Sequence, residues 1–412
     1  MEYTELKREL RRRVQEKLDY VKDLSDDEVG QTIDEALLEQ RELMIYPVEL
    51  RRRLRKELFD SLRRLDILQI FVEDSSVTEI MINGKDHIFV EQDGKLRELD
   101  TGFESMEKLQ DVIQQIVAGC NRVVNEASPI VDARLPNGAR VNIVMSPVAL
   151  NGPIVTIRRF PDKPITMERL LRLGSISLEA ADFLEATVKA GYNIFISGGT
   201  GSGKTTFLNV LSHYIPSEER VITIEDSAEL QLQGLPNLVR LETRNSNVEG
   251  CSEITIRELI RSSLRMRPDR IIVGEVRGAE AIDMLQCLNT GHDGSMSTGH
   301  ANSAKDMLAR LENMVLMGME LPLAAIRQQI ASGVDILVHL GRLRDKSRRV
   351  LEITELVGCE SGEIRLNPLY VFEESGEDGE GRVKGELQKK GELLHENKLK
   401  AAGLSKLPME KG

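Results

Sequence analysis

The sequence predicts an α/β protein whose main domain is a wound parallel sheet, with a smaller α+β domain and a helical region ahead of it. Three observations lead to this fold class. Strand-like and helical runs alternate over residues 167–372, short β-rich runs fill residues 69–157, and apolar residues recur at helical spacing over residues 1–68. We therefore expect three structured parts, with a linker at residues 158–166 where two prolines interrupt regular structure.

The helical region is dense in charge and carries two apolar stripes. Arginines between the apolar positions alternate with Glu and Asp, which favours a solvated helix face. A partner or membrane-proximal surface is the alternative. The stripes are Leu6, Leu10, Val14, Leu18 and Val21, and then Leu50, Leu54, Leu58, Leu62 and Leu65.

The α+β domain is predicted from short runs rich in β-branched residues. Glu79–Gly84 and His87–Val90 read as strands, and Asp93-Gly94 follows as a turn. Apolar residues recur at helical spacing over residues 109–117. Two further strand-like runs follow, Ala139–Val144 and Ile154–Ile157. At the other end of the chain, residues 373–412 are predicted to form a flexible charged tail, because Glu373–Gly391 is rich in Gly and charge and poor in large apolar residues.

A glycine-rich segment between a strand-like run and a helix carries the most informative chemistry. Residues 198–205 fit the pattern G-x-x-x-x-G-K-[ST] and follow the apolar run Tyr192–Ser197. Such a loop turns backbone N–H groups towards a polyphosphate, while Lys204 reaches the β and γ phosphates and Thr205 offers a hydroxyl to Mg²⁺. An unoccupied glycine turn is the plain alternative. We predict an ATP site made by Gly198, Gly199, Thr200, Gly201, Ser202, Gly203, Lys204, Thr205 and Thr206.

Acidic residues follow two predicted strands of the same domain. The run Arg220–Ile224 leads into three carboxylates, Glu225, Asp226 and Glu229, and a second run from Arg270 leads into Glu275. Ligands bind beyond the carboxyl ends of strands in such folds, and hydrolysis needs one carboxylate for water and another group for the metal. We therefore predict Glu275 as a catalytic residue and, with Thr205, a Mg²⁺ ligand. For the water-activating role we prefer Glu229, with Glu225 left open.

Composition argues against several other classes of protein. The formal net charge is −12, so general affinity for nucleic acid is not expected, although local basic patches remain possible. The four cysteines stand alone, which predicts neither a zinc site nor a disulfide framework but reduced and mostly buried thiols. No apolar stretch approaches the roughly 20 residues that span a bilayer, and no secretory signal is evident. A cytoplasmic protein is expected.

The combined motifs resemble the secretion traffic ATPases, of the GspE/PulE-like type II/type IV secretion superfamily. Among these, the resemblance is strongest to the CpaF/TadA-type ATPases of Flp (Tad) pilus assembly. It covers roughly Leu65 to Tyr370, and the lack of a paired-cysteine insert favours the CpaF and conjugative branches. The segments that carry it are the loop at 198–205, Ile224–Glu229, Leu264–Gly278, Thr290–Asn302, and upstream Ser76–Gly84, Asp132–Val141 and Thr156–Phe160.

This resemblance implies a RecA-like P-loop ATPase domain behind a PAS-like domain, assembled into a hexameric ring whose domains rock as ATP turns over. It implies Mg²⁺ as cofactor, an inner-membrane platform protein as partner and a place at the cytoplasmic face of that membrane. It also makes His292 and His300 candidates for sensing the γ-phosphate. We favour His292, because Gly299 could loosen the second histidine. Candidates to reach the γ-phosphate from another domain or subunit are Arg134, Arg140, Arg158 and Arg159.

Two alternatives to a pilus motor remain open. One is a conjugative type IV secretion ATPase. The other is a nucleotide-gated scaffold that changes shape on binding ATP but hydrolyses negligibly. Glu229, Glu275 and His292 together argue for turnover, because a pure sensor does not need all three.

Overall fold

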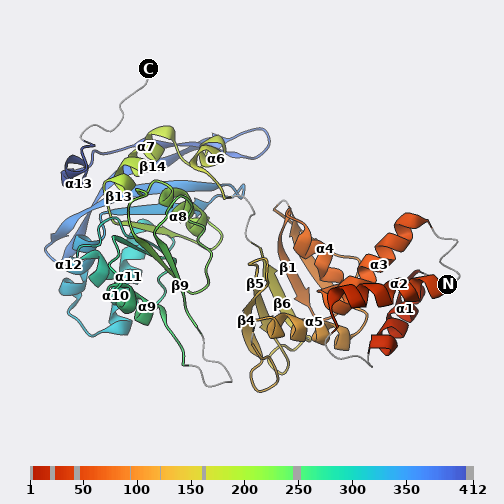
Figure 1. The fold of residues 1–412 in the computed structure, drawn as a ribbon. Coiled ribbons are helices and arrows are strands. Elements are labelled where there is room, and N and C mark those ends of the chain that lie inside the picture. The colour runs from red at the N-terminus through yellow and green to blue at the C-terminus, as the bar shows by residue number, and fades with distance from the viewer. Residues whose placement is uncertain are drawn as a thin grey trace. The chain divides into compact units, whose positions relative to one another are not determined.

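A computed structural model describes residues 3–18, 24–40, 47–92, 94–120, 122–159, 164–244 and 252–404. The chain divides into two compact units, Met1–Asp162 and Lys163–Gly412 (Figure 1). The division falls inside the predicted linker, of which residues 160–163 lie outside the described residues. Each unit is therefore treated separately, and the finer domain boundaries stay predictions.

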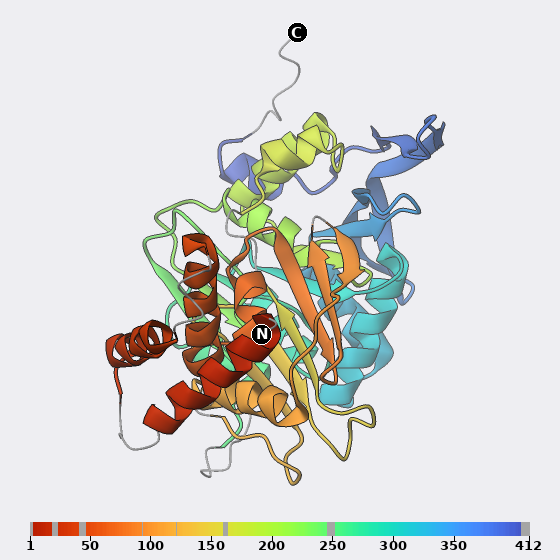
Figure 2. The ribbon, with the colours of Figure 1, turned by 90° about the vertical axis from the view of Figure 1, so that its right-hand side faces the viewer.

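The first unit begins with three helices that share a small apolar core (Figure 2). Leu6, Leu10 and Val14 are buried in that core with residues of the next two helices, as the helical spacing predicts. The second helix starts at a capping box in which Ser25 and Glu28 satisfy each other's backbone N–H groups. Val21 lies outside the described residues. The helices are α1 (Tyr3–Leu18), α2 (Asp26–Glu39) and α3 (Val48–Arg63).

An antiparallel sheet with a covering helix completes the first unit. Its strands run in the order β3-β2-β1-β6-β5-β4. Helix α5 buries Leu109, Val112 and Ile113 in the same core as the alternate residues Ile80 and Ile82 of β1. The α+β character is as predicted. The elements are a 3₁₀ turn (Asp66–Leu68), α4 (Gln69–Glu73), β1 (Val77–Asn83), β2 (His87–Gln92), β3 (Lys95–Glu98), α5 (Met106–Ala118), β4 (Ile130–Arg134), β5 (Arg140–Val144) and β6 (Ile154–Arg158).

The second unit is built on a nine-stranded sheet in the order β15-β14-β13-β12-β7-β11-β10-β8-β9. Neighbours from β12 to β9 pair in parallel, whereas β12 to β15 form an antiparallel extension. The predicted wound α/β domain is therefore present. The strands are β7 (Ile194–Gly198), β8 (Val221–Glu225), β9 (Leu238–Glu242), β10 (Arg270–Val273), β11 (Met296–His300), β12 (Ile336–Arg342), β13 (Arg348–Glu360), β14 (Glu363–Glu377) and β15 (Val383–Lys389).

Helices cover both faces of this sheet (Figure 1). Ile194 and Ile196 of the central strand β7 join the core formed with α7 and α8, while Phe195 between them joins the core formed with α10 and α11. A strand buried on both faces explains the unbroken apolar run in the sequence. The helices are α6 (Met167–Arg172), α7 (Leu178–Lys189), α8 (Lys204–Ser212), α9 (Ile256–Ser263), α10 (Ala281–Leu288), α11 (Ala304–Gly318), α12 (Leu323–Gly333) and α13 (Asn397–Ala401).

The prediction of a flexible charged tail over residues 373–412 is wrong for most of that range. Residues 373–404 contain the end of β14, all of β15 and α13, and only residues 405–412 lie outside the described residues. Leu387, Leu393 and Leu399 are buried in the core beside α7. Strands at a sheet edge carry charged side chains on their exposed faces, so a segment rich in charge can still form ordered strands. The low apolar content of this segment therefore led to a wrong prediction of disorder.

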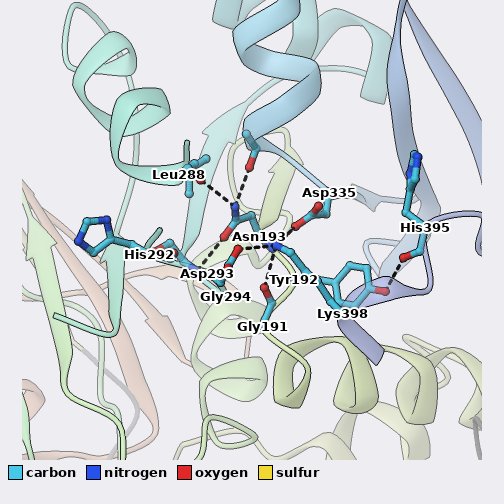
Figure 3. Close-up of polar contacts among 12 residues, drawn as sticks. Gly191, Tyr192, Asn193, Leu288, His292, Asp293, Gly294, Asp335, His395 and Lys398 are labelled. Carbon is cyan, nitrogen blue, oxygen red and sulfur yellow. Dashed lines mark hydrogen bonds and ion pairs between the residues drawn. The ribbon is translucent and has the colours of Figure 1, made fainter. Parts of the chain in front are cut away.

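Polar contacts anchor this C-terminal segment at the amino ends of the central strands (Figure 3). The Tyr192 hydroxyl donates to the His395 carbonyl at 2.6 Å. Lys398 Nζ lies 2.7 Å from carboxylate oxygens of both Asp293 and Asp335, and it donates to the Gly191 carbonyl at 3.1 Å. These contacts hold together the chain segments that enter β7, β11 and β12.

The described cysteines Cys120, Cys287 and Cys359 are free thiols, and Cys251 lies outside the described residues. Only Cys287 is buried, which raises its pKa to about 12. The expectation of mostly buried cysteines is thus correct for Cys287 alone. Within the described ranges, no helix combines the length and apolar character that a membrane span requires.

Candidate active site

The glycine-rich loop joins the end of β7 to the start of α8, as the sequence predicts. Gly203 caps α8 with a φ of +96°, and Gly201 also has a positive φ of +71°. A Cβ built at Gly198 would lie 2.5 Å from the Leu340 carbonyl oxygen of the adjacent strand. These positions require glycine, either for backbone conformation or for close approach of β12. The helix N-terminus and the loop therefore present backbone N–H groups, the feature that binds phosphate.

Lys204 is buried at the base of this loop. Its Nζ donates to the carbonyls of Gly198 and Gly199, both at 3.1 Å, and lies 3.2 Å from His300 Nδ1. Burial lowers the pKa of the Lys204 ammonium, and the nearby Glu275 carboxylate opposes that change. Neutral carbonyls are weaker partners for an ammonium than phosphate oxygens are. The lysine is thus held where a polyphosphate can take over its contacts.

Glu275 and His300 meet beside Lys204. His300 Nε2 lies 2.7 Å from Glu275 Oε1, and Arg277 Nη2 donates to Glu275 Oε2 at 2.8 Å. The strand register brings His300 to this place, because β11 pairs with β7 in a way that sets His300 opposite Gly198, the first residue of the loop. Burial lowers the pKa of His300, while Glu275 raises it. The parallel strands therefore gather a cation, an imidazole and a carboxylate at one edge.

The preference for His292 over His300 is not supported by this geometry. His292 precedes β11 and lies at the amino edge of the sheet, near Asn193 and Asp293 (Figure 3). Its Nδ1 is 3.3 Å from the Cys287 carbonyl. Gly299 does not loosen the second histidine. It lies in the buried strand β11, where an added Cβ would come within 3.0 Å of Phe195 and Met307. Its missing side chain permits tight packing of β11 next to His300. We transfer the proposed phosphate-sensing role to His300.

Glu225 is committed to the loop that follows its own strand. Its Oε2 accepts hydrogen bonds from the backbone N–H groups of Glu229 at 2.6 Å and Leu230 at 2.9 Å. The side chain is 3% exposed, and burial raises its pKa to about 7. A Cβ at Gly274 would lie 2.9 Å from Glu225 Cγ, so β10 packs directly against it. Glu229 is half-buried and remains our choice for the water-activating group.

Oxygen donors suited to Mg²⁺ lie around the loop. Thr205 is in the first turn of α8, and Glu275 follows β10, which matches the hydroxyl-plus-carboxylate set that this ion takes beside a nucleotide. Both Glu275 oxygens are already within 3 Å of nitrogen atoms, from His300 and Arg277. Thr205 and Glu275 have the chemistry to hold Mg²⁺, provided that His300 or Arg277 moves away from the Glu275 carboxylate.

The four arginines predicted to reach the γ-phosphate from another domain or subunit belong to the first unit, and the structure separates them into two groups. Arg134, Arg140 and Arg158 are directly opposite one another on β4, β5 and β6, which places them in one row on one face of the sheet. Arg159 donates instead to the Asp74 carbonyl within the same unit. A row of three arginines is a strong local positive charge. Arg158 also lies directly opposite Glu79 of β1. The role of all four arginines at a neighbouring site stays a prediction.

Sequence reasoning missed a basic hairpin beside the loop. Arg348 Nε, at the start of β13, donates to the Gly201 carbonyl at 2.8 Å. Its partner across the hairpin is Arg342, at the end of β12. The available signal was the run of five Lys and Arg residues within residues 342–349, which has no counterpart in the motifs used for prediction.

Comparison with known proteins places these features in one family. The family described as type II/IV secretion system protein matches residues 62–372. A putative conjugal transfer protein of Mycobacterium tuberculosis is 36% identical over 296 residues, covering 70% of this chain and 84% of that protein. A probable conjugal transfer protein, TrbB, of Sinorhizobium fredii is 32% identical, covering 76% and 93%. The pilus retraction motor PilT, solved with ADP, has a TM-score of 0.52 at 20% identity, covering 84% and 88%, and supports the fold.

The raised pKa of Glu225 predicts a specific dependence of stability on pH. The folded state binds the Glu225 proton more tightly than the unfolded state between pH 4.5 and about 7, so the free energy of unfolding falls as pH rises through that window. Converted from the pKa difference, this loss is about 3 kcal/mol. Glu225→Gln removes the titration, so urea unfolding followed by circular dichroism should show the variant gaining on wild type between pH 5 and pH 8.

The matched control is Glu218→Gln, an exposed glutamate of the same unit. Its stability should track wild type at both pH values. A constant difference between Glu225→Gln and wild type across this range would contradict the prediction, because folding would then leave the titration of Glu225 unchanged.

Proposed function

Because the chain belongs to the family of type II/IV secretion system proteins, we propose that it is a Mg²⁺-dependent ATPase that powers pilus assembly or secretion. One observation carries this proposal: Lys204, His300 and Glu275 converge at the mouth of a phosphate-binding loop. Loop and lysine suffice for nucleotide binding. The added imidazole and carboxylate are the groups that hydrolysis requires, so they favour an enzyme over a nucleotide-gated scaffold.

In this proposal each residue has a defined task in phosphoryl transfer. Lys204 and the loop N–H groups hold the β and γ phosphates, and His300 faces the γ-phosphate. Glu229 orients the attacking water and accepts its proton, while Glu275 supplies negative charge beside the metal and the water. Thr205 and Glu275 would hold a Mg²⁺ ion, which would supply positive charge to offset the phosphate charge. ATP brings negative charge to Lys204 and His300, whose pKa values burial lowers in its absence.

We further propose a hexameric ring in which the arginine row of one subunit completes the site of its neighbour. Positive charge facing the γ-phosphate stabilises the transition state and makes turnover depend on assembly. Arg134, Arg140 and Arg158 supply such charge as one group, and Arg158 is exposed. Work on partners would then come from rigid-body motion of the units.

The branch of the family to which we assign this chain depends on its helical region, its cysteines and the names of its relatives. The helical region and the absence of a paired-cysteine insert favour a Flp/Tad-type pilus motor, placed at the cytoplasmic face of the inner membrane through a platform protein. The names of the conjugal transfer relatives favour the alternative, a conjugative type IV secretion ATPase. The net charge of −12 weighs against direct nucleic-acid binding in either case.

Glu275→Gln is expected to separate binding from chemistry. The amide keeps the shape of the side chain but cannot accept a proton or hold the same charge beside metal and water, so turnover should fall roughly 10²-fold or more. ATP affinity should stay close to wild type. Steady-state hydrolysis and calorimetric titration of ATP in Mg²⁺ buffer measure the two quantities.

Glu218→Gln is again the control, because it neutralises an exposed glutamate that we place outside the site. Lys204→Ala is the comparison variant that should lose ATP binding. Parallel losses of affinity and rate in Glu275→Gln would mark Glu275 as structural. Absence of ATP hydrolysis by the assembled wild-type protein would favour the scaffold.

Subunit mixing tests the shared site. Arg158→Ala and Glu275→Gln should each be poor enzymes alone, but mixed rings contain interfaces at which both halves are intact. Some activity should therefore return on mixing. Co-purification of two affinity tags verifies subunit exchange before hydrolysis is measured.

Arg97→Ala is the matched arginine control, because Arg97 is exposed on β3 at the opposite edge of the same sheet. That variant should retain full activity without mixing. Exchanged rings with no recovery at any ratio of the two mutants would contradict a site shared between subunits.

A further inference from the structure

The β12–β13 hairpin places an unusual concentration of positive charge beside the phosphate-binding loop. Residues 342–349 contain five Lys and Arg residues and one Asp in a chain whose net charge is −12. The hairpin lies next to the loop because β12 pairs in parallel with β7, with Leu340 opposite Gly198. Its basic end therefore projects from the same sheet edge as the loop.

Two of these cations are committed elsewhere. Arg344 binds Glu374 at 2.6 and 2.7 Å and also pairs with Glu377. Arg349 donates to the carbonyls of Gly174 at 2.7 Å and Val383 at 3.1 Å. Both residues hold the hairpin against its own unit, and neither contacts the loop.

Arg348 lies directly against the loop. Its Nε donates to the Gly201 carbonyl at 2.8 Å, and its Cδ lies 3.5 Å from the position of a Cβ at Gly203. Within the described part of the chain, its two terminal nitrogens make no hydrogen bond. Arg342 adds a second guanidinium, with Nη1 3.9 Å from the position of a Cβ at Gly201. Both side chains are exposed.

We propose that Arg348, supported by Arg342, is a nucleotide-binding residue that contacts the phosphates of the nucleoside triphosphate in the same subunit. This inference rests on the proposed function, since it names a further contact to the same substrate. A guanidinium presents several N–H donors in a plane and binds phosphate oxygens strongly. With Nε holding Gly201, the terminal nitrogens remain for the anion that the loop encloses.

This role differs from that of the arginine row in the first unit. Arg348 belongs to the same unit as the loop and needs no neighbouring subunit. It contributes to affinity for the nucleotide, so it acts before any step that depends on assembly.

Arg348→Gln tests the proposal in the full-length protein by calorimetric titration of ATP with Mg²⁺. Glutamine keeps a neutral N–H donor for the Gly201 carbonyl but loses the charge. We expect the Kd for ATP to rise about tenfold or more, the range for a lost charged hydrogen bond. The dependence of Kd on salt should weaken as well, which loss of a neutral brace would not cause.

Arg344→Gln is the matched control, because it removes an equal charge from the same hairpin at a residue bound to Glu374 and Glu377. Its Kd should stay at the wild-type value. Circular dichroism checks folding, and Arg348→Lys provides a second variant, which keeps the charge without the planar fork. It should bind ATP more weakly than wild type while keeping the salt dependence.

The outcomes distinguish this inference from the proposed function. Failure of wild type to bind ATP, or unchanged binding by Lys204→Ala, would refute the nucleotide site itself. If wild type binds and Lys204→Ala does not, wild-type affinity in folded Arg348→Gln overturns the role of Arg348. An equal loss in Arg344→Gln also overturns it, since the effect would then come from general charge. Should Arg348→Gln not fold, wild-type affinity in Arg348→Lys would be decisive against the proposal.

Discussion

The parallel pairing of β11 with β7 is the constraint on which the rest of the site depends. It places His300 opposite Gly198, so the imidazole reaches Lys204 at 3.2 Å and Glu275 at 2.7 Å. A shift of one residue in this register would turn His300 to the other face of the sheet. The packing of Phe195 and Met307 against Gly299 opposes such a shift, because no larger residue fits there.

The same strands are also fixed at their amino ends. The buried Asn193 amide donates to the Gly333 carbonyl at 2.8 Å and accepts from the Ser295 backbone at 3.1 Å (Figure 3). Lys398 adds ion pairs to Asp293 and Asp335. Buried polar groups with all partners satisfied define one arrangement, because any slip leaves them unpaired at a cost of about 1–3 kcal/mol each. The site at the carboxyl edge thus depends on polar contacts at the opposite edge.

Sequence reasoning recovered those parts of the site that local pattern determines. The loop, the start of α8 at Lys204 and the placement of Glu225 and Glu275 after strands all follow from residues close together in the chain. Local pattern could not decide between His292 and His300, because the choice depends on which end of β11 lies beside the loop, and only the pairing of distant strands determines that. The four arginines were predicted as one set. That three of them form a row while Arg159 does not is likewise decided by the pairing of distant strands.

The C-terminal part of the fold escaped prediction for a different reason. Strands at an edge carry charge on their exposed face, so β14 and β15 resemble disordered sequence when hydrophobicity alone is considered. The buried Leu393 and Leu399 become meaningful only once the core beside α7 exists. Arg348 was missed by the same logic, since its significance lies in its contact with Gly201, 147 residues earlier in the chain.

The most direct measurement of this account compares two histidine substitutions by steady-state ATP hydrolysis. The central claim is that turnover takes place at the edge where β7, β10 and β11 deliver Lys204, Glu275 and His300. His300→Gln should then lower kcat by about 10²-fold, as expected when a group facing the transferring phosphate is lost. His292→Gln, which changes the same residue type at the other end of β11, should hydrolyse ATP like wild type. Full activity in His300→Gln with loss of activity in His292→Gln would contradict the account.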